Sequence, residues 1–137
     1  MIKHYPEPVV GVLISNSKGE ILLAKSKKWR NKYSLFGGKV EIGEKIEDAV
    51  RREVKEETGL EISDIKFIDF QEAITKKSFW KKKHFIFLDF ACKTKSYKDI
   101  KLNSENQEFI WVYPKKALTL PLNPYASVTI ERYLKNF

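Results

Sequence analysis

The sequence is poor in cysteine and lacks long apolar runs. Cys92 is the only cysteine among 137 residues, which excludes an internal disulfide framework and favours a reducing compartment. No apolar run approaches the roughly 18 residues of a membrane span, and the segment after Met1 lacks the apolar core of a secretory signal. We therefore expect a soluble, cytoplasmic protein with a single domain over residues 1–137, long enough to bury a real core.

Acidic residues are the minority charge, and they are unevenly distributed. The chain has 26 Lys and Arg against 18 Asp and Glu, which gives a formal net charge of +8. Seven acidic residues nevertheless gather in one stretch: Glu41, Glu44, Glu47, Asp48, Glu53, Glu56 and Glu57. The basic remainder is typical of a solvated surface, or of a protein that attracts a polyanion such as a nucleotide. Composition alone does not distinguish these two possibilities.

The pattern of apolar and turn residues predicts several strands and two helices. The expected strands are 9–14 and 20–24, paired as a hairpin about the turn at 16–19, and then 67–74, 84–92 and 109–113. Loops are expected at 25–34 and at KKSFWKKK, residues 76–83. One helix should cover 46–58 with Gly59 as its stop, and another should begin at Asn123 and Pro124 and continue to about Leu134. These elements predict a mixed sheet covered by helices.

The predicted helix at 46–58 places some of its glutamates unusually. At about 100° per residue, an apolar stripe faces the core and contains Ile46, Ala49, Val50 and Val54. Glu53 and Glu57 continue this stripe, and Glu56 borders it. These three neighbours repel one another, and a cation would relieve that cost. Because hard carboxylate oxygens suit Mg²⁺ or Mn²⁺, the spacing predicts a metal site, with raised carboxylate pKa values as the alternative.

A glycine pair and one more glutamate precede this helix. Glu44 would fall on the far side of a continuous helix, so we expect it in the loop that enters the helix. Gly37 and Gly38 permit unusual backbone angles and the close approach of a ligand. A backbone carbonyl there could join the metal site, and a plain tight turn is the alternative.

These residues resemble the Nudix signature, G-x5-E-x7-R-E-U-x-E-E-x-G-U with U apolar. Every fixed position agrees: Gly38, Glu44, Arg52, Glu53, Val54, Glu56, Glu57, Gly59 and Leu60. The strands on either side and the C-terminal helix also resemble this family, so the resemblance covers the whole domain. It implies an α/β/α sandwich with a mixed central sheet, and hydrolysis of a nucleoside diphosphate linked to another moiety.

The resemblance also implies roles for the matching residues. Glu56 and Glu57 would be the main ligands of Mg²⁺ or Mn²⁺. Glu53 would be a further ligand or would orient the attacking water. Arg52 would hold a glutamate in place by a charge-assisted hydrogen bond, and Glu44 would support the site.

Two further metal ligands follow from the same resemblance. The Gly37 carbonyl would complete the shell, and a later loop often adds a glutamate in this family, just before a strand of the form E-h-x-W. Glu108 fits that place, since it precedes Phe109 and Trp111, and Glu105 is the competing candidate. An ordinary surface carboxylate is the alternative for each.

The signature does not specify the substrate. The proline that marks ADP-ribose enzymes and the tyrosine that marks diadenosine polyphosphate enzymes are both missing around Lys76. The chain then resembles the MutT-like (deoxy)nucleoside triphosphate pyrophosphohydrolases, some of which act on damaged nucleotides. Hydrolysis of ADP-ribose or another nucleotide sugar is the alternative activity. A non-catalytic module that binds a nucleotide or RNA is the alternative function.

Five residues other than the fixed positions of the signature are expected to contact the nucleotide. Lys25 and Lys39 would contact phosphates, Trp29 and Trp80 would stack on the base, and Asn123 would read the base at the start of the last helix. The alternatives are solvated lysines, aromatic side chains packed on the domain, and a plain helix cap. We expect a small-molecule nucleotide as the partner, rather than nucleic acid or a membrane, and a monomer or homodimer.

Overall fold

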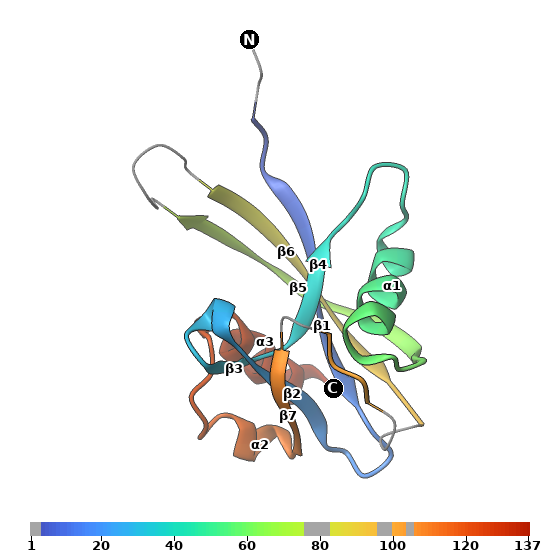
Figure 1. The fold of residues 1–137 in the computed structure, drawn as a ribbon, viewed down its shortest axis with the longest axis vertical. Helices are drawn as coiled ribbons and strands as arrows, with labels where there is room; N and C mark the ends of the chain where they lie inside the picture. Colours follow the sequence, from blue (N-terminus) through green and yellow to red (C-terminus); the bar gives the residue numbers. More distant parts are fainter. Residues whose placement is uncertain (1–3, 76–82, 96–99, 104–105) are drawn as a thin grey trace.

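A mixed sheet lies between two layers of helices in the computed structural model, which describes residues 4–75, 83–95, 100–103 and 106–137 (Figure 1). The elements are β1 (Glu7–Ser15), β2 (Ile21–Ser26), the 3-10 turn η1 (Lys27–Trp29), β3 (Lys32–Ser34), β4 (Phe36–Lys39), α1 (Ile46–Thr58), β5 (Ser63–Thr75), β6 (Lys83–Lys93), β7 (Asn106–Val112), α2 (Pro114–Ala117) and α3 (Pro124–Asn136). The strand order is β3-β2-β1-β6-β5, with β4 paired to β1 and β7 to β2. The predicted α/β/α sandwich with a mixed sheet is therefore confirmed.

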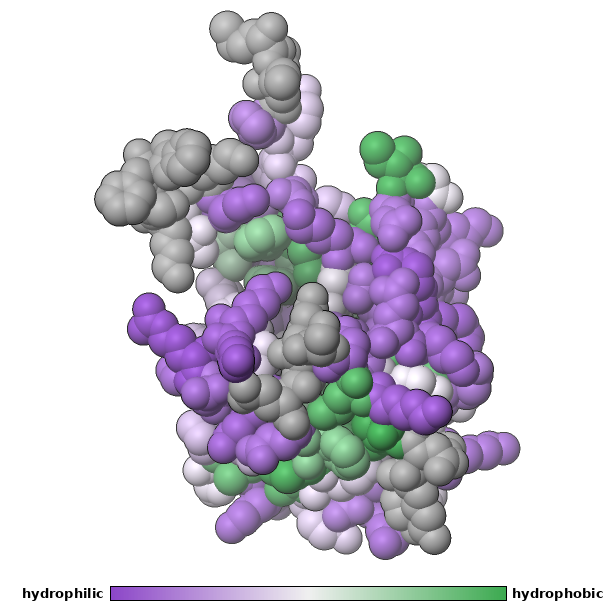
Figure 2. Space-filling view, in the orientation of Figure 1, coloured by the Kyte–Doolittle hydropathy of each residue, from purple (hydrophilic) through white to green (hydrophobic). Residues whose placement is uncertain are grey.

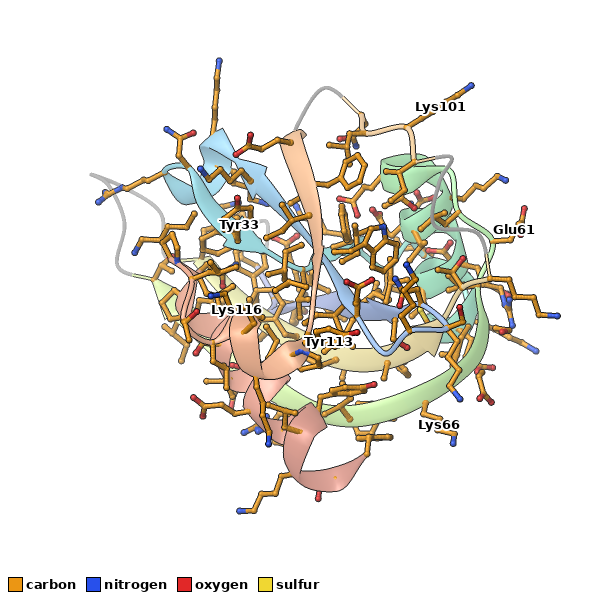
Figure 3. All side chains as sticks on the ribbon, turned by 90° about the horizontal axis from the view of Figure 1, so that it is seen from below. Tyr33, Glu61, Lys66, Lys101, Tyr113 and Lys116 are labelled. Carbon is orange, nitrogen blue, oxygen red and sulfur yellow. The ribbon has the colours of Figure 1, made fainter. Side chains whose placement is uncertain are left out.

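Strand β1 runs through the middle of the molecule. It pairs in parallel with β6 along its whole length and antiparallel with β4 from Val9 to Val12. Its side chains alternate between two cores: Val12 belongs to the cluster with Val50 of α1, and Leu13 to the cluster with Ile130 of α3. This double burial explains why the strand is a continuous apolar run. Figure 3 shows the strands between α1 on one side and α2 and α3 on the other.

Strand β2 does not form the simple hairpin that the sequence predicts. Its only register pair with β1 is Ser15 with Ile21, within the described residues, and it then pairs with β3 and β7. Strand β4 occupies the place beside Val9 to Val12. The predicted loop at 25–34 is also wrong in part, because it contains the end of β2, the turn η1 and strand β3. Helix α2 was not predicted.

Both long helices follow their predicted signals. Helix α1 covers Ile46–Thr58 and ends at Gly59, whose φ of 76° is left-handed and whose N–H bonds to the Lys55 carbonyl. Helix α3 begins at Pro124, and the Asn123 Oδ1 accepts a hydrogen bond from the Ala126 N–H at 2.9 Å. No helix of the described residues is long and apolar enough to cross a membrane.

One member of the predicted apolar stripe is misplaced. Ala49, Val50 and Val54 are fully buried, whereas Ile46 is 42% exposed. Ile46 is the first residue of α1 and precedes the turns that pack on β1 and β4. Periodicity assigns a face to a side chain but does not show whether the sheet extends beneath it.

Candidate active site

The three glutamates of α1 that match the signature differ in burial as their helical positions predict. Glu57 is 7% exposed, and its Oε2 accepts a hydrogen bond from the Gly37 N–H at 3.0 Å. The Glu53 side chain is 13% exposed, and that of Glu56 is 56% exposed. Hydrophilic side chains cover the outer side of α1 (Figure 2). The carboxylates of Glu53 and Glu57 therefore lie on the side of α1 that faces β4.

The glycine pair lies in β4 and allows close approach on both sides of that strand. A Cβ added to Gly38 would overlap the Glu53 carboxylate, and one added to Gly37 would overlap the Val10 carbonyl. Gly37 and Gly38 are paired with Gly11 and Val10 in the sheet, so the pair is not a tight turn. Local packing against β1 and α1 requires both glycines.

Arg52 connects the helix to the preceding loop. Its guanidinium donates twice to Glu44, from Nε to Oε2 at 2.7 Å and from Nη2 to Oε1 at 2.9 Å. Nη2 also donates to the Lys39 carbonyl at 3.0 Å, and Nη1 donates to Glu53 Oε1 at 2.8 Å. The Arg52 guanidinium lowers the pKa of Glu44 from 4.5 to about 2, and Glu44 in turn raises the pKa of Arg52. Glu44 is thus ionised throughout the neutral range.

The same guanidinium lies between two of the helix carboxylates. Arg52 Nη1 is 3.3 Å from Glu56 Oε2 as well as 2.8 Å from Glu53 Oε1. In the described part of the chain, no three acidic, histidine or cysteine side chains are gathered as a metal-binding group. The donor set itself fits a hard divalent cation, because it consists of carboxylate oxygens on one helix with a glycine opposite Glu53.

A pocket adjoins the glycine pair and is lined by Gly37 and Gly38 themselves. Four aromatic residues line it: Trp29, Phe36, Phe87 and Tyr125. The ring centroids are 6.2 Å apart for Trp29 and Tyr125 and 5.1 Å apart for Tyr125 and Phe87. Its polar lining consists of Lys28, Ser34, Asp89, Asn123 and Thr129. An aromatic wall with a few polar groups is the usual construction of a small-molecule site.

Asp89 is a pocket residue that was not predicted from the sequence. It is 3% exposed, and its Oδ2 accepts hydrogen bonds from Gln71 Nε2 at 2.8 Å and Thr129 Oγ1 at 3.1 Å. Burial raises the pKa of this carboxyl. The sequence carries a signal for it, because Asp89 interrupts the apolar run HFIFLDFAC. The lining residues Lys28, Tyr125 and Thr129 carry no comparable signal.

The predicted nucleotide contacts lie in different places. Trp29 and Asn123 line the pocket, and Asn123 also caps α3 and donates to Ser34 Oγ. Lys39 forms an ion pair with Glu7 at 2.7 Å. Trp80 lies outside the described residues with most of the loop predicted at 76–83, and Lys83, the last residue of that loop, belongs to β6 instead.

Glu108 and Glu105 are the two candidates for an additional metal ligand, and the structure describes Glu108. Glu108 lies in β7 and forms an ion pair at 3.2 Å with Lys25, the other lysine predicted to contact phosphate. Lys25 also lies over the Tyr33 ring, 5.2 Å from its centroid. Glu105 lies outside the described residues. Lys25 as a phosphate contact and Glu108 as a metal ligand therefore both require this ion pair to break.

Comparison with known proteins agrees with this geometry. The model of the NUDIX domain matches residues 5–133. The nucleoside triphosphatase NudI of Salmonella agona (strain SL483) is 38% identical over 125 residues, covering 84% of this chain and 87% of that protein. A MutT protein from Methanosarcina mazei Go1 is 30% identical with a TM-score of 0.78, covering 98% and 97% of the two chains. The NUDIX domain of Shewanella oneidensis NrtR, seen in complex with ADP ribose, shares the fold at a TM-score of 0.79 and 15% identity, covering 97% and 89%. The chain therefore belongs to the Nudix family and is a Nudix hydrolase.

Proposed function

We propose that this hydrolase converts a (deoxy)nucleoside triphosphate into the monophosphate and pyrophosphate, with Mg²⁺ or Mn²⁺ as the cofactor. The observation that carries the proposal is the position of Gly37 and Gly38. Both glycines line the aromatic pocket, and both contact or adjoin the glutamates of α1. A nucleotide with its base in the pocket would extend its phosphates along β4 towards α1.

The pocket supports a nucleoside on chemical grounds. Trp29, Tyr125 and Phe87 offer aromatic faces, and stacking of one base on an aromatic side chain contributes roughly 1–3 kcal/mol. Lys28 at the pocket can approach a phosphate. Lys39 and Lys25 are further phosphate contacts in this proposal, once they exchange their carboxylate partners for the substrate. The relatives support a triphosphate in particular, because one of them is named a nucleoside triphosphatase.

Glu53, Glu56 and Glu57 are the proposed metal ligands, together with the Gly37 carbonyl and Glu108. A cation held there would offset the charge of the phosphates and lower the pKa of water. The role of Glu108 would require release of Lys25. Glu57 is the strongest candidate, because its burial and its bond from Gly37 N–H hold its carboxylate beside the glycine pair.

The remaining chemistry belongs to side chains of the helix. Water forms a bond to one phosphorus while the bond from that phosphorus to its bridging oxygen breaks. Glu53 accepts the proton of the water, and pyrophosphate leaves. Arg52 fixes the Glu53 side chain through Nη1, and Glu44 fixes Arg52 through two bonds. Cys92 cannot supply a nucleophile instead, since burial raises the pKa of its thiol to about 12.

A substrate panel tests the proposal. The protein would be incubated with Mg²⁺ and each common and oxidised nucleoside triphosphate, and also with ADP-ribose and nucleotide sugars, while pyrophosphate and phosphate are detected separately. We expect pyrophosphate from at least one triphosphate and its loss on chelation. Turnover of ADP-ribose alone, or of nothing, would contradict the proposal.

A further inference from the structure

We propose that Asp89 selects the base, by accepting a hydrogen bond from an exocyclic amino group of the nucleobase in the pocket. This inference rests on the proposed function, since it names the class of nucleotide which that site takes. Adenine, cytosine and guanine carry such an amino group, whereas uracil and hypoxanthine carry a carbonyl or a hydrogen in its place. The observations behind it are the position of Asp89, its hydrogen bonds and the cost of its burial.

Asp89 lies in one row of the sheet with Gly37, the first glycine of the pair. It is in register with Gly11 of β1, and Gly11 is in register with Gly37 of β4. Two strand spacings amount to about 10 Å, which separates Asp89 from the phosphate end of the proposed site. Gly11 allows this arrangement, because a Cβ there would overlap the Asp89 Oδ1. The pocket therefore has an acidic group at the end distant from α1.

The hydrogen bonds to Asp89 are unequally shared between its two oxygens. Gln71 Nε2 and Thr129 Oγ1 both donate to Oδ2. Gln71 Nε2 also donates to the Tyr125 carbonyl at 3.1 Å, which fixes the orientation of the Gln71 amide. Within the described residues, the side-chain hydrogen bonds of Asp89 all go to Oδ2. Oδ1 lies against Gly11, which lines the pocket as Asp89 does, and is the oxygen that we assign to the ligand.

Burial of the Asp89 carboxylate beside the pocket costs free energy, because the charged form loses its hydration. Desolvation is the largest influence on its pKa and raises it, and only neutral donors contact it. The charged groups nearby are Asp69 of β5, which raises the pKa further, and Arg132 of α3, which lowers it. A protein with an apolar side chain of similar volume at this position would ordinarily be as stable as one with a buried charged group, or more stable. A ligand N–H on Oδ1 would recover part of the cost, because a hydrogen bond to the charged form favours it.

Replacement of Asp89 by Asn exchanges a hydrogen-bond acceptor at the pocket for a donor. Gln71 Nε2 must face the amide oxygen of the new residue, because Nε2 only donates and cannot bond to an NH₂. The NH₂ then takes the position of Oδ1. An acceptor becomes a donor at the pocket, with almost no change in shape.

The experiment compares kcat/KM within nucleotide pairs that differ at one group: CTP with UTP, ATP with ITP, and GTP with ITP. We expect the wild type to prefer the amino member of at least one pair, roughly 5- to 150-fold, as one good base contact allows. Asp89→Asn should abolish or invert that preference. Asp69→Asn is the control, since it removes a neighbouring carboxylate that does not line the pocket, and should keep the preference. Equal losses for all nucleotides, or ratios that Asp89→Asn leaves unchanged, would overturn the inference.

A binding measurement separates this inference from the proposed hydrolysis. Nucleoside monophosphates (CMP and UMP, AMP and IMP, GMP and IMP) would be titrated against the wild type without metal, using calorimetry. A preference for the amino member supports base selection even if no triphosphate is hydrolysed. Hydrolysis of triphosphates together with equal binding of both members of every pair overturns the inference alone. The wild-type titration also decides the question if the Asp89→Asn protein does not fold.

Discussion

Glu44 and Arg52 form a bidentate ion pair between the loop that joins β4 to α1 and the helix itself. Both guanidinium nitrogens donate at 2.7 and 2.9 Å, and Glu44 Oε1 also accepts from the Glu41 N–H at 3.0 Å. Glu44 therefore closes its own loop and holds the arginine that contacts Glu53. A residue outside the helix thus positions the carboxylates on it.

The first prediction concerns the pH dependence of this ion pair. Because the folded-state pKa of Glu44 is lowered from 4.5 to about 2, its contribution to stability is fully present above pH about 4.5 and is lost as the pH falls towards 2. Glu44→Gln should lower the Tm near neutral pH, and the difference from wild type should shrink continuously below pH 4.5. Thermal denaturation from pH 2 to 7 measures it. A difference that stays constant across this range would contradict the assignment.

The second prediction concerns the geometry of Arg52. Lysine keeps the positive charge but cannot donate to Glu44, Glu53 and the Lys39 carbonyl at once, because it lacks the planar fork. Arg52→Lys should lower kcat by about 10- to 100-fold, as loss of a positioning partner in a metal site typically does. The circular dichroism spectrum should stay that of the wild type. Arg51→Lys on the same helix is the control, and activity close to wild type in Arg52→Lys would count against a positioning role.

The sequence predicted the positions of the α1 glutamates for a physical reason. The glutamates of α1 and the two glycines are close in the chain, and helical periodicity alone places Glu53 and Glu57 beside the core. The Asn123 cap was also predicted, because a cap depends on its own few residues. The exposed Ile46 shows the limit of the same periodicity, which does not show how far the sheet extends.

The aromatic pocket depends on contacts between residues that are distant in sequence. Asp89 meets Gly11 only because β6 pairs in parallel with β1, and it meets Thr129 only because α3 packs beside β5. Local patterns do not show which strands become neighbours. The predicted hairpin of β1 and β2 is limited to the pair Ser15 and Ile21 beside the turn for the same reason, since β4 pairs with β1 from Val9 to Val12.

The third prediction concerns the fit between Gly38 and Glu53. A Cβ at Gly38 would overlap the Glu53 carboxylate, so Gly38→Ala should displace that side chain and reduce kcat at least about 10-fold, while also lowering the Tm. A double-mutant cycle on the Tm tests the cause. In the Glu53→Ala background the clash is gone, so Gly38→Ala should then cost much less stability. Equal costs in both backgrounds would show that Glu53 is not what Gly38 accommodates.

The fourth prediction concerns Glu57 as a metal ligand. Glu57→Gln keeps an oxygen that can accept from the Gly37 N–H but removes the charge, so kcat should fall about 100-fold or more while the fold persists. Glu47→Gln is the matched control, because Glu47 lies on the exposed side of the same helix. Calorimetric titration with Mn²⁺ should show weaker binding for Glu57→Gln than for Glu47→Gln. Equal affinities and rates in the two variants would remove Glu57 from the ligand set.

The last prediction concerns Trp29 as a stacking surface for the base. Trp29 lines the pocket beside Tyr125 and lies far from the chemistry in the proposed pose, so it should bind the ground state and the transition state equally. Trp29→Ala should therefore raise KM about 5- to 150-fold, the value of one stacked base, and leave kcat within about threefold. Tyr113→Ala serves as the control, because Tyr113 is an aromatic residue that is 56% exposed and does not line the pocket. A fall in kcat at constant KM would instead place Trp29 in the positioning of the phosphates, and unchanged kinetics would show that the base binds elsewhere.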